Sequence, residues 1–260
     1  MDLQSLALKL EPVIRQAGAY IRTAVPQSVT EKTGYRDLVT EYDVNTQRML
    51  VSAFSEIHPT ASFFGEEDGL KADISKGDCF VIDPIDGTAN FVAGFNRSCI
   101  SVALLRDGSP VIGIIYNPWA EEYFCAVRGC GTTVNGTPLH IRPRGLKEGF
   151  VSLGTAPYYP DLMMRTFRIC AEVVGIAPDI RRTGTAAQDF CDLAMNRTVA
   201  FFELRLSPWD FAAGILIVNE AGGEVTDIDG NPVSFEAPSS IVAGCTQARE
   251  ELVEIIRRVP

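Results

Sequence analysis

The sequence predicts an α/β (α+β) fold in which helices and sheets stack in layers. Helical spacing of apolar residues recurs at both ends of the chain, and short β-rich segments fill its middle. Neither a strict βαβ rhythm nor an all-β pattern emerges, so layered packing is the expected architecture. A chain of 260 residues, 46% of them hydrophobic, can bury a full core. We expect a single domain over residues 1–260 with two packed halves, roughly 1–145 and 146–260.

The first half is predicted to hold two helices and a series of strands. Apolar residues such as Leu6, Leu10 and Ile14 recur at helical spacing over residues 3–24. Residues 35–42 form a predicted strand that ends at Asp43, and a second helix follows to about Ile57. Further strands are expected over 61–65, over 79–82 and in three segments between 98 and 127. Turn sequences at 106–108, 117–119, 129–131 and 135–136 separate the later elements.

The second half alternates between the two kinds of element. Strands are predicted at about 149–153, 179–182, 199–203 and 239–243. Helices are predicted over 160–174, 185–195 and 208–221, and a last one begins at 246. This alternation differs from the strand-rich first half, which again favours separate layers.

Composition excludes several classes of protein. The net charge of −10, from 23 basic and 33 acidic residues, argues against a nucleic-acid substrate. The 7 cysteines show no CxxC pair, and with 2 histidines a histidine-rich metal site is excluded. No apolar stretch is long enough to span a membrane. The first residues lack a basic cluster ahead of an apolar core, so we expect a cytoplasmic protein rather than a secreted one.

Five acidic residues stand at predicted junctions between elements, where a rigid scaffold can aim side chains at one point. They are Asp43, Glu66, Asp83, Asp86 and Asp210. Magnesium takes oxygen ligands, usually a few carboxylates completed by water and substrate phosphate. Converging carboxylates repel one another unless cations neutralise them. Convergence would therefore indicate a site with more than one metal ion, of the kind that serves phosphoryl transfer.

The segment from Asp83 to Thr88, with the sequence DPIDGT, is the most informative in the chain. Pro84 fixes the backbone between two acids, so that both can turn towards one ion. Gly87 permits close approach to a ligand, and Thr88 opens a short predicted helix to Val92 whose free N–H groups suit a phosphate. An Asx-type turn with Asp86 as a helix cap explains this segment equally well on its own.

The other acids also have simple structural interpretations. In Ser207-Pro208-Trp209-Asp210, serine at the N-cap, proline at N1 and an acid at N3 make a capping box. Glu66 lies in an acidic turn sequence, and capping of the following helix is the alternative role for Asp43. The small residues around Thr185 and Ala186 suit either helix packing or ligand binding. Each segment alone leaves both readings open.

Taken together, these segments resemble the inositol monophosphatase family. The matching segments are DLVT ahead of Asp43, GEE at 65–67, DPIDGT with NF at 83–91, GTAA at 184–187 and WD with AAG at 209–214. They occur in the family's order and cover roughly residues 5–250. The combination is highly specific, although GEE alone would mean little. The resemblance implies a layered αβαβα sandwich, dependence on Mg²⁺, inhibition by lithium and usually a homodimer.

The resemblance also implies a role for each acid. Glu66, Asp83 and the Ile85 carbonyl would hold a first magnesium ion, and Asp83, Asp86 and Asp210 a second. A third, weaker ion would lean on Glu66. Thr88, oriented by Asp43, would help activate the attacking water, and the Gly87 and Thr88 N–H groups would hold the phosphate. Lys32 would help to hold a metal-linked water.

The implied substrate is a small phosphorylated polyol or sugar, with inositol 1-phosphate first. Glu203, Ala186, Thr185 and, by a looser alignment, Thr155 would contact the part of the substrate that carries no phosphate. Gln188-Asp189 departs from the more usual pair of residues at that position. Relatives with nearly the same metal ligands hydrolyse fructose bisphosphate, histidinol phosphate, adenosine bisphosphate or NADP. Some bacterial relatives bind the transcription machinery, which is an alternative of another class.

Overall fold

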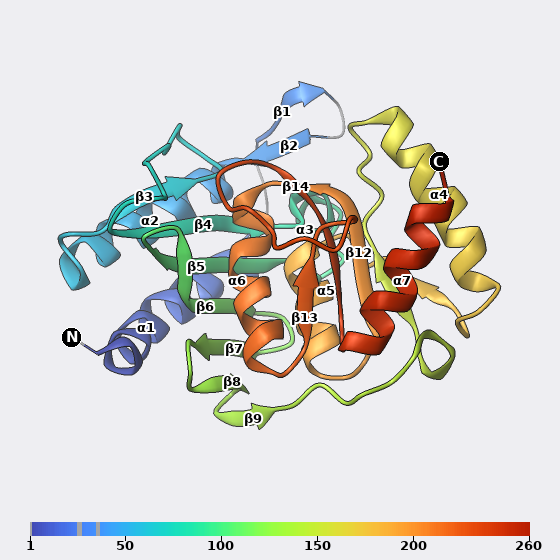
Figure 1. Ribbon diagram of the computed structural model, residues 1–260. Helices are drawn as coiled ribbons and strands as arrows, with labels where there is room; N and C mark the ends of the chain where they lie inside the picture. Colours follow the sequence, from blue (N-terminus) through green and yellow to red (C-terminus); the bar gives the residue numbers. More distant parts are fainter. Residues whose placement is uncertain (1, 25–27, 35–36) are drawn as a thin grey trace.

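The computed structural model describes residues 2–24, 28–34 and 37–260, which form five layers (Figure 1). Two helices cover the outer face of a 7-stranded sheet, and two more helices separate that sheet from a 5-stranded one. A last pair of helices covers the far face of the smaller sheet. The predicted αβαβα sandwich is confirmed. In the described ranges, no helix is both long and apolar enough to cross a membrane.

The larger sheet keeps its strands in chain order. Its members are β3 (Ser62–Gly65), β4 (Asp78–Asp86), β5 (Cys99–Arg106), β6 (Ser109–Asn117), β7 (Glu122–Val127), β8 (Gly131–Val134) and β9 (Thr137–Leu139). Its first pair is parallel and the rest are antiparallel. Alternate residues of β4 face opposite sides, as the pleat requires. Phe80 and Ile82 pack under α1 (Leu3–Arg22) and α2 (Glu41–Ile57), whereas Cys79 and Val81 face the central helices.

The smaller sheet has the strand order β11-β10-β12-β14-β13. Its strands are β10 (Val151–Leu153), β11 (Ile180–Arg181), β12 (Ala200–Leu206), β13 (Glu224–Thr226) and β14 (Ser239–Gly244). Helices α4 (Pro160–Val174) and α7 (Thr246–Arg258) cover its outer face. Short connecting elements complete the chain: β1 (Val29–Gly34), β2 (Asp37–Thr40), α3 (Thr88–Val92) and η1 (Leu146–Glu148).

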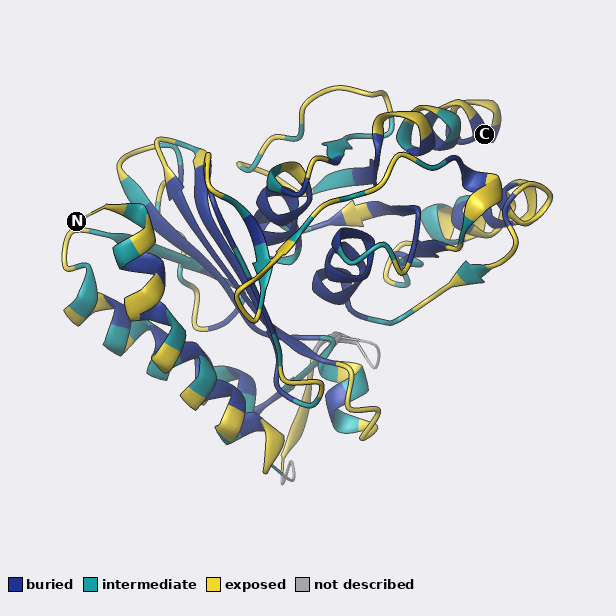
Figure 2. Ribbon diagram, turned by 90° about the horizontal axis from the view of Figure 1, so that it is seen from below, coloured by how far each residue is buried: buried dark blue, intermediate teal, exposed yellow. Residues whose placement is uncertain are grey.

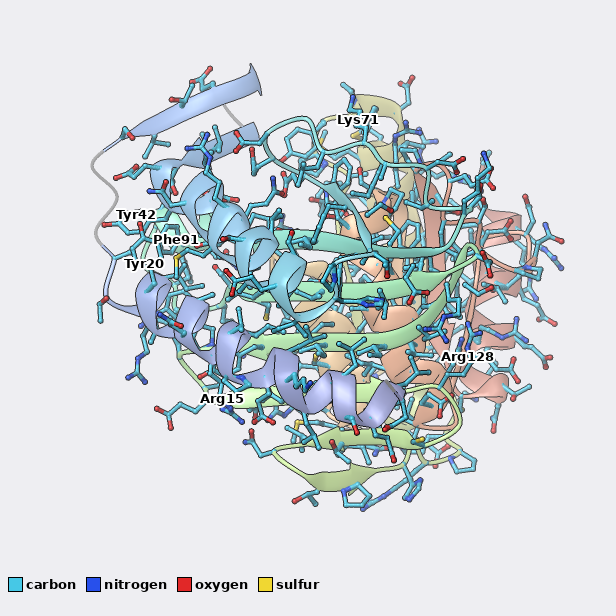
Figure 3. All side chains as sticks on the ribbon, turned by 90° about the vertical axis from the view of Figure 1, so that its left-hand side faces the viewer. Arg15, Tyr20, Tyr42, Lys71, Phe91 and Arg128 are labelled. Atoms are coloured by element: carbon cyan, nitrogen blue, oxygen red, sulfur yellow. The ribbon has the colours of Figure 1, made fainter. Side chains whose placement is uncertain are left out.

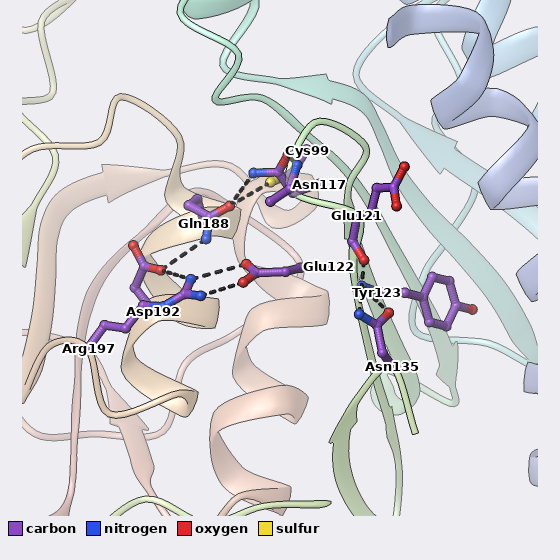
Figure 4. A network of polar contacts seen from close by, with 10 residues as sticks. Cys99, Asn117, Glu121, Glu122, Tyr123, Asn135, Gln188, Asp192 and Arg197 are labelled. Carbon is purple, nitrogen blue, oxygen red and sulfur yellow. Dashed lines mark hydrogen bonds and ion pairs between the residues drawn. The ribbon is translucent and has the colours of Figure 1, made fainter. Parts of the chain in front are cut away.

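The central helices are α5 (Ala186–Ala194) and α6 (Pro208–Glu220). Because they lie between two sheets, they are buried on nearly every side, while α1 and α2 show an exposed outer stripe (Figure 2). A helix that is buried all round must satisfy its polar side chains internally. In α5, Gln188 accepts a hydrogen bond from Asn117 Nδ2 at 2.8 Å and donates to Asp192 at 3.0 Å. Arg197 joins Asp192 to Glu122 of β7 (Figure 4).

Most predicted elements are present, with shifted ends. The strand predicted over 35–42 is β2, which ends at Thr40, while positions 35 and 36 lie outside the described residues. Helix α2 therefore begins at Glu41 with Thr40 as its N-cap, and Asp43 completes the capping box from the third helical position. Strand β12 runs to Leu206, so Glu203 lies inside the strand and not at its end. Strands β1, β8, β9 and β13 were not predicted. The single-domain assignment stays a prediction.

Candidate active site

A pocket of about 640 Å³ opens between the two halves of the chain. The acidic residues predicted for the site line it, except Asp43. The predicted residues in its wall are Glu66, Asp83, Ile85, Asp86, Gly87, Thr88, Thr185, Ala186, Glu203 and Asp210. A second cavity of about 490 Å³, between η1 and α7, contains none of the predicted site residues. The residues that the sequence singled out thus gather from five separate segments into one place.

A β-bulge in β4 places Asp83 and Asp86 on the same side. In a regular strand, residues three apart point to opposite faces. Here Asp83 pairs with Ser101 and Asp86 with Cys99, so three steps on β4 match two steps on β5. The extra residue re-aims the side chains, and Pro84 costs no ladder hydrogen bond at such an irregular position. Both carboxylates consequently line the pocket.

A second irregularity lies in β12. Glu203 pairs with Ile241 and Leu206 with Ser239, so three residue steps on β12 match two on β14. The Glu203 side chain lies over Gly154, where an added Cβ would come within 1.8 Å of Glu203 Oε2. The Ala156 N–H donates to Glu203 Oε1 at 3.3 Å. Because Gly154 has no side chain, this carboxylate can pack against its backbone in the pocket wall.

Three of the carboxylates are held in the same way. Asp83 Oδ1 accepts from the Ile85 N–H at 3.0 Å, and Asp210 Oδ2 accepts from the Ser207 N–H at 2.7 Å. Asp86 Oδ2 accepts from Thr185 Oγ1 at 2.6 Å and from the Ala187 N–H at 2.5 Å. Within the described residues, the second oxygen of each carboxylate accepts no hydrogen bond. Each acid is therefore oriented through one oxygen and offers the other to a ligand.

The raised pKa values of these acids indicate a site that binds cations. Burial raises the pKa of Asp83 well above its ordinary value, and the nearby charges of Glu66 and Asp86 raise it further. Burial likewise raises the pKa of Asp210, with Asp86 and Glu66 adding to the effect. Burial raises the pKa of Asp86 to about 6, against the opposing hydrogen bonds from Thr185 and the Ala187 N–H. Opposite charge in the pocket would reverse these shifts.

Asp43 lies one hydrogen bond behind the pocket wall. Its Oδ2 accepts from the Thr40 N–H at 2.8 Å and from Thr40 Oγ1 at 2.6 Å, which is the capping interaction of α2. Its Oδ1 faces Thr88 Oγ1 at 3.1 Å, and that hydroxyl also lies 3.2 Å from the Ile85 carbonyl. Asp43 therefore caps its helix and contacts Thr88 at the same time.

Aromatic packing fixes the elements around Thr88. Tyr42 of α2 lies between Tyr20 of α1 and Phe91 of α3, with ring centroids 5.1 and 5.9 Å apart (Figure 3). The short α3 begins after Gly87, whose φ of 88° belongs to the left-handed region that glycine tolerates. Gly87, not Asp86, occupies the N-cap position of α3, so the capping interpretation of Asp86 is wrong. Asp86 binds α5 instead.

The oxygen donors of the pocket are of the type that binds divalent cations, although they do not by themselves form a complete coordination shell. Among the described residues, no three acidic, histidine or cysteine side chains surround a single point as a complete ion site. The oriented carboxylates with one free oxygen each, and the Ile85 carbonyl, are the hard oxygen donors that Mg²⁺ prefers. Magnesium commonly completes its shell with waters and substrate phosphate, so few protein ligands per ion suffice.

Of the predicted residues whose side chains the structure describes, Asp43 and Thr155 lie outside the pocket wall. Thr155 is half-buried and lies outside the lining, although its neighbour Gly154 is part of it. The side chain of Lys32 lies outside the described residues. Sequence reasoning did not propose Arg182, Tyr159 or Asp189, which do line the pocket. The nearest sequence signal for Arg182 and Asp189 is their position beside the GTAA segment at 184–187, whereas Tyr159 lies far from that segment in the chain.

Comparison with known proteins shows which family the chain belongs to. The model of the inositol monophosphatase family matches residues 2–260. The chain belongs to the inositol monophosphatase family. Among curated relatives of this family, an inositol-1-monophosphatase from Synechocystis is 32% identical over 100% of this chain and 91% of its own. A protein from Vibrio cholerae named Nus factor SuhB is 34% identical over 94% of this chain and 92% of its own.

The fold agrees as well. The crystal structure of extragenic suppressor protein suhB from Bartonella henselae matches with a TM-score of 0.91 and 31% identity, over 98% of this chain and 99% of that one. Membership of the inositol monophosphatase family supports a phosphatase and does not by itself select a substrate. The relatives' names divide between enzymes and Nus factors.

Proposed function

We propose that this protein is a Mg²⁺-dependent phosphomonoesterase for small polyol or sugar phosphates, with inositol 1-phosphate as the first candidate. One observation carries the proposal: Asp83, Asp86 and Asp210 are each locked through one oxygen and present the other to a single pocket. A structural role needs no such free oxygens, because a buried acid without a partner costs stability. Family membership supports the same chemistry.

The proposed ion sites follow the donors in the pocket. Glu66, Asp83 and the Ile85 carbonyl would hold one Mg²⁺, and Asp83, Asp86 and Asp210 a second, with a third leaning on Glu66. When bound, the ions supply positive charge that stabilises the attacking and leaving oxygens during in-line displacement. Two or three ions would also neutralise the repulsion among these acids.

The protein's own groups position the water and the phosphate. Thr88 Oγ1, with Asp43 Oδ1 at 3.1 Å as its acceptor, can accept a hydrogen bond from the attacking water while passing its own proton towards Asp43. The pKa of Asp43 is raised by burial, which suits a carboxylate that receives a proton. The N–H groups of Gly87 and Thr88 would hold phosphate oxygens. Water attacks directly, so no phosphoenzyme forms.

The far end of the pocket would hold the alcohol portion of the substrate. Glu203 is its main acceptor for hydroxyl hydrogen bonds, and burial raises the pKa of this group to about 7. Thr185 and the Ala186 N–H line the same wall, while Thr155 would have to move to reach it. A polyol with adjacent hydroxyl groups matches this set of donors and acceptors.

We also propose a homodimer in the cytoplasm with no nucleic-acid partner. Helix α4 and the residues after it expose a band of apolar side chains, including Met164 at 51% and Phe167 at 53% exposure. Large exposed apolar side chains in one area are typical of an interface. A second copy of the chain is the partner that the family expectation names.

Phosphate release tests the function directly. Purified protein with Mg²⁺ would be offered about twenty phosphorylated metabolites, including inositol 1-phosphate, fructose 1,6-bisphosphate, histidinol phosphate, adenosine bisphosphate and NADP. We expect the highest kcat/KM with inositol 1-phosphate or a similar polyol phosphate, and inhibition by Li⁺. If every phosphate ester were untouched at several Mg²⁺ concentrations, the enzymatic proposal would be wrong.

A regulatory role is the second candidate, because relatives such as the one from Vibrio cholerae are named Nus factors. Binding to purified transcription complexes would support it. An Asp83→Asn variant separates the two roles, since it should lose phosphatase activity and keep any such binding.

A further inference from the structure

Asp189 is a buried acid of the pocket wall to which the proposed mechanism gives no role. It lies in the first turn of α5, is 1% exposed, and lines the pocket beside the GTAA turn. Its Oδ1 is buried and has no hydrogen-bond partner in the described structure. Its Oδ2 lies 3.0 Å from Thr183 Oγ1. A buried carboxylate anion with an unpartnered oxygen would be strongly destabilising.

The hydrogen bonds around Thr183 define where the protons are. The Thr183 hydroxyl accepts from the Thr185 N–H at 3.3 Å. The same hydroxyl lies 3.0 Å from the Thr185 carbonyl and 3.0 Å from Asp189 Oδ2. A hydroxyl has one proton, and both of those neighbours are acceptors if Asp189 is ionised. The hydroxyl could then donate to only one of these two oxygens, and the other contact would bring two acceptor oxygens together with no proton between them.

A protonated Asp189 removes the conflict. Its Oδ2–H donates to the second lone pair of Thr183 Oγ1, and the Thr183 hydroxyl donates to the Thr185 carbonyl. The Thr183 hydroxyl then has a partner for its proton and for both of its lone pairs, and the unpartnered Asp189 Oδ1 is a neutral carbonyl oxygen. Burial raises the pKa of Asp189 well above its ordinary value, against the opposing contact with Thr183, and the nearby charges of Glu203, Asp192 and Asp86 raise it further.

We propose that Asp189 is a positioning residue that acts as a neutral hydrogen-bond donor to Thr183. The turn that it holds carries Thr185 and leads into the Ala187 N–H, and these two groups orient Asp86 through contacts of 2.6 and 2.5 Å. Asn90 secures the same turn from α3, donating to the Thr183 carbonyl at 2.9 Å. Asp189 therefore acts on the site through the turn, and this role rests on the proposed function.

Three variants test the proposal. Asp189→Asn keeps a donor, since its Nδ2 can donate to Thr183 Oγ1, and should retain activity within about threefold. Asp189→Leu has a similar shape without a donor, and should lower kcat/KM by about ten- to a hundredfold, the equivalent of one lost buried hydrogen bond. It should also weaken Mg²⁺ binding measured by calorimetry, because Asp86 is less well oriented. Thr183→Val should add little to Asp189→Leu in a double-mutant cycle.

Infrared difference spectroscopy measures the protonation state of Asp189 and does not depend on enzyme activity. With Mg²⁺ present near neutral pH, wild type minus Asp189→Asn should show the band of a protonated carboxyl group. Asp192→Asn is the matched control, one turn along the same helix, where the carboxylate pairs with Arg197 at 2.8 Å. Its difference spectrum should show an ionised carboxylate band.

The outcomes separate this proposal from the proposed function. An ionised band for Asp189, or an Asp189→Asn variant as damaged as Asp189→Leu, would overturn the neutral donor. Full Mg²⁺ affinity and activity in Asp189→Leu would overturn the positioning role. If wild type hydrolysed no phosphate ester, the proposed function would fail, while the infrared and calorimetric measurements would still decide both points about Asp189.

Discussion

Asp43 makes contacts that belong to two roles: its Oδ2 caps α2 through Thr40, and its Oδ1 faces Thr88. Asp210 likewise accepts from the Ser207 N–H at the start of α6 and still lines the pocket. At the scale of single residues, capping and function are therefore compatible, because a carboxylate has two oxygens. A helix cap fixes one oxygen and thereby aims the other.

Glu203 offers a residue-scale prediction about selectivity. Glu203→Ala should lower kcat/KM for inositol 1-phosphate by about ten- to a hundredfold, because a polyol hydroxyl loses a buried hydrogen-bond partner worth about 1–3 kcal/mol. A simple aryl phosphate, which has no such hydroxyl, should be hydrolysed almost as before. Steady-state kinetics on both substrates measures the difference. Equal losses on the two substrates would place Glu203 in the ion site or the structural core instead.

At the scale of elements, the position of α5 depends on buried polar contacts to the larger sheet. Asn117 Oδ1 accepts from the N–H groups of Trp119 and Ala120, both at 3.1 Å, and its Nδ2 donates to Gln188. Cys99 Sγ lies 3.5 Å from the same Gln188 oxygen (Figure 4). These contacts join the end of β6 to the helix whose first turn faces the pocket.

Removing Asn117 should therefore destabilise the protein. We expect Asn117→Ala to lower the free energy of unfolding by about 2 kcal/mol, since several partners are left unsatisfied in a buried place. Urea denaturation monitored by circular dichroism measures the change. Asn219→Ala, at an exposed position near the end of α6, is the control and should change stability by less than about 0.5 kcal/mol. Equal stability of the two variants would show that the Asn117 contacts carry no net energy.

Element by element, the sequence predicted what depends on local pattern. The 3.6-residue period predicted α1 and α4, the capping sequence at Ser207 predicted the start of α6, and the motif around Asp83 and Asp86 located the pocket. The bulges in β4 and β12 were not predictable, because strand register depends on the partner strand. Short strands such as β13 carry too few residues for a pattern. The proton on Asp189 follows only from a three-dimensional hydrogen-bond arrangement.

At the scale of the whole molecule, the acids of the pocket link stability to pH and to cations. Burial raises the pKa of Asp86 from 3.8 to about 6 and that of Glu203 from 4.5 to about 7. A group whose pKa is higher in the folded than in the unfolded state stabilises the fold fully below its unfolded pKa. That contribution is lost as the pH rises through the folded pKa.

The protein without divalent cations should therefore become less stable across this range. We expect its Tm to fall between about pH 5 and pH 8, and Mg²⁺ to raise the Tm more at the higher pH, where the carboxylates are ionised. Differential scanning calorimetry with and without Mg²⁺ measures both effects. Glu203→Gln should reduce the slope. A Tm of the cation-free protein that rises over this interval would contradict the assigned direction.

The oligomeric state is a second property of the whole molecule. Light scattering should give a mass near twice 28.3 kDa, because the exposed apolar side chains of α4 suit a second copy. Phe167→Glu should shift the mass towards the monomer, whereas Glu172→Gln on the same helix should not. A monomer at micromolar concentration in the wild type would show that this face has another role or none.

The central claim is that the free carboxylate oxygens of the pocket serve a cation-dependent hydrolysis. Phosphate release from inositol 1-phosphate, measured against Mg²⁺ concentration for the wild type, Asp83→Asn and Asp210→Asn, tests it most directly. We expect release by the wild type to require Mg²⁺ and both variants to lose at least about a hundredfold in kcat, with circular dichroism unchanged, because transition-state charge stabilisation is worth several kcal/mol. Undiminished release in excess chelator, or by either folded variant, would contradict the account.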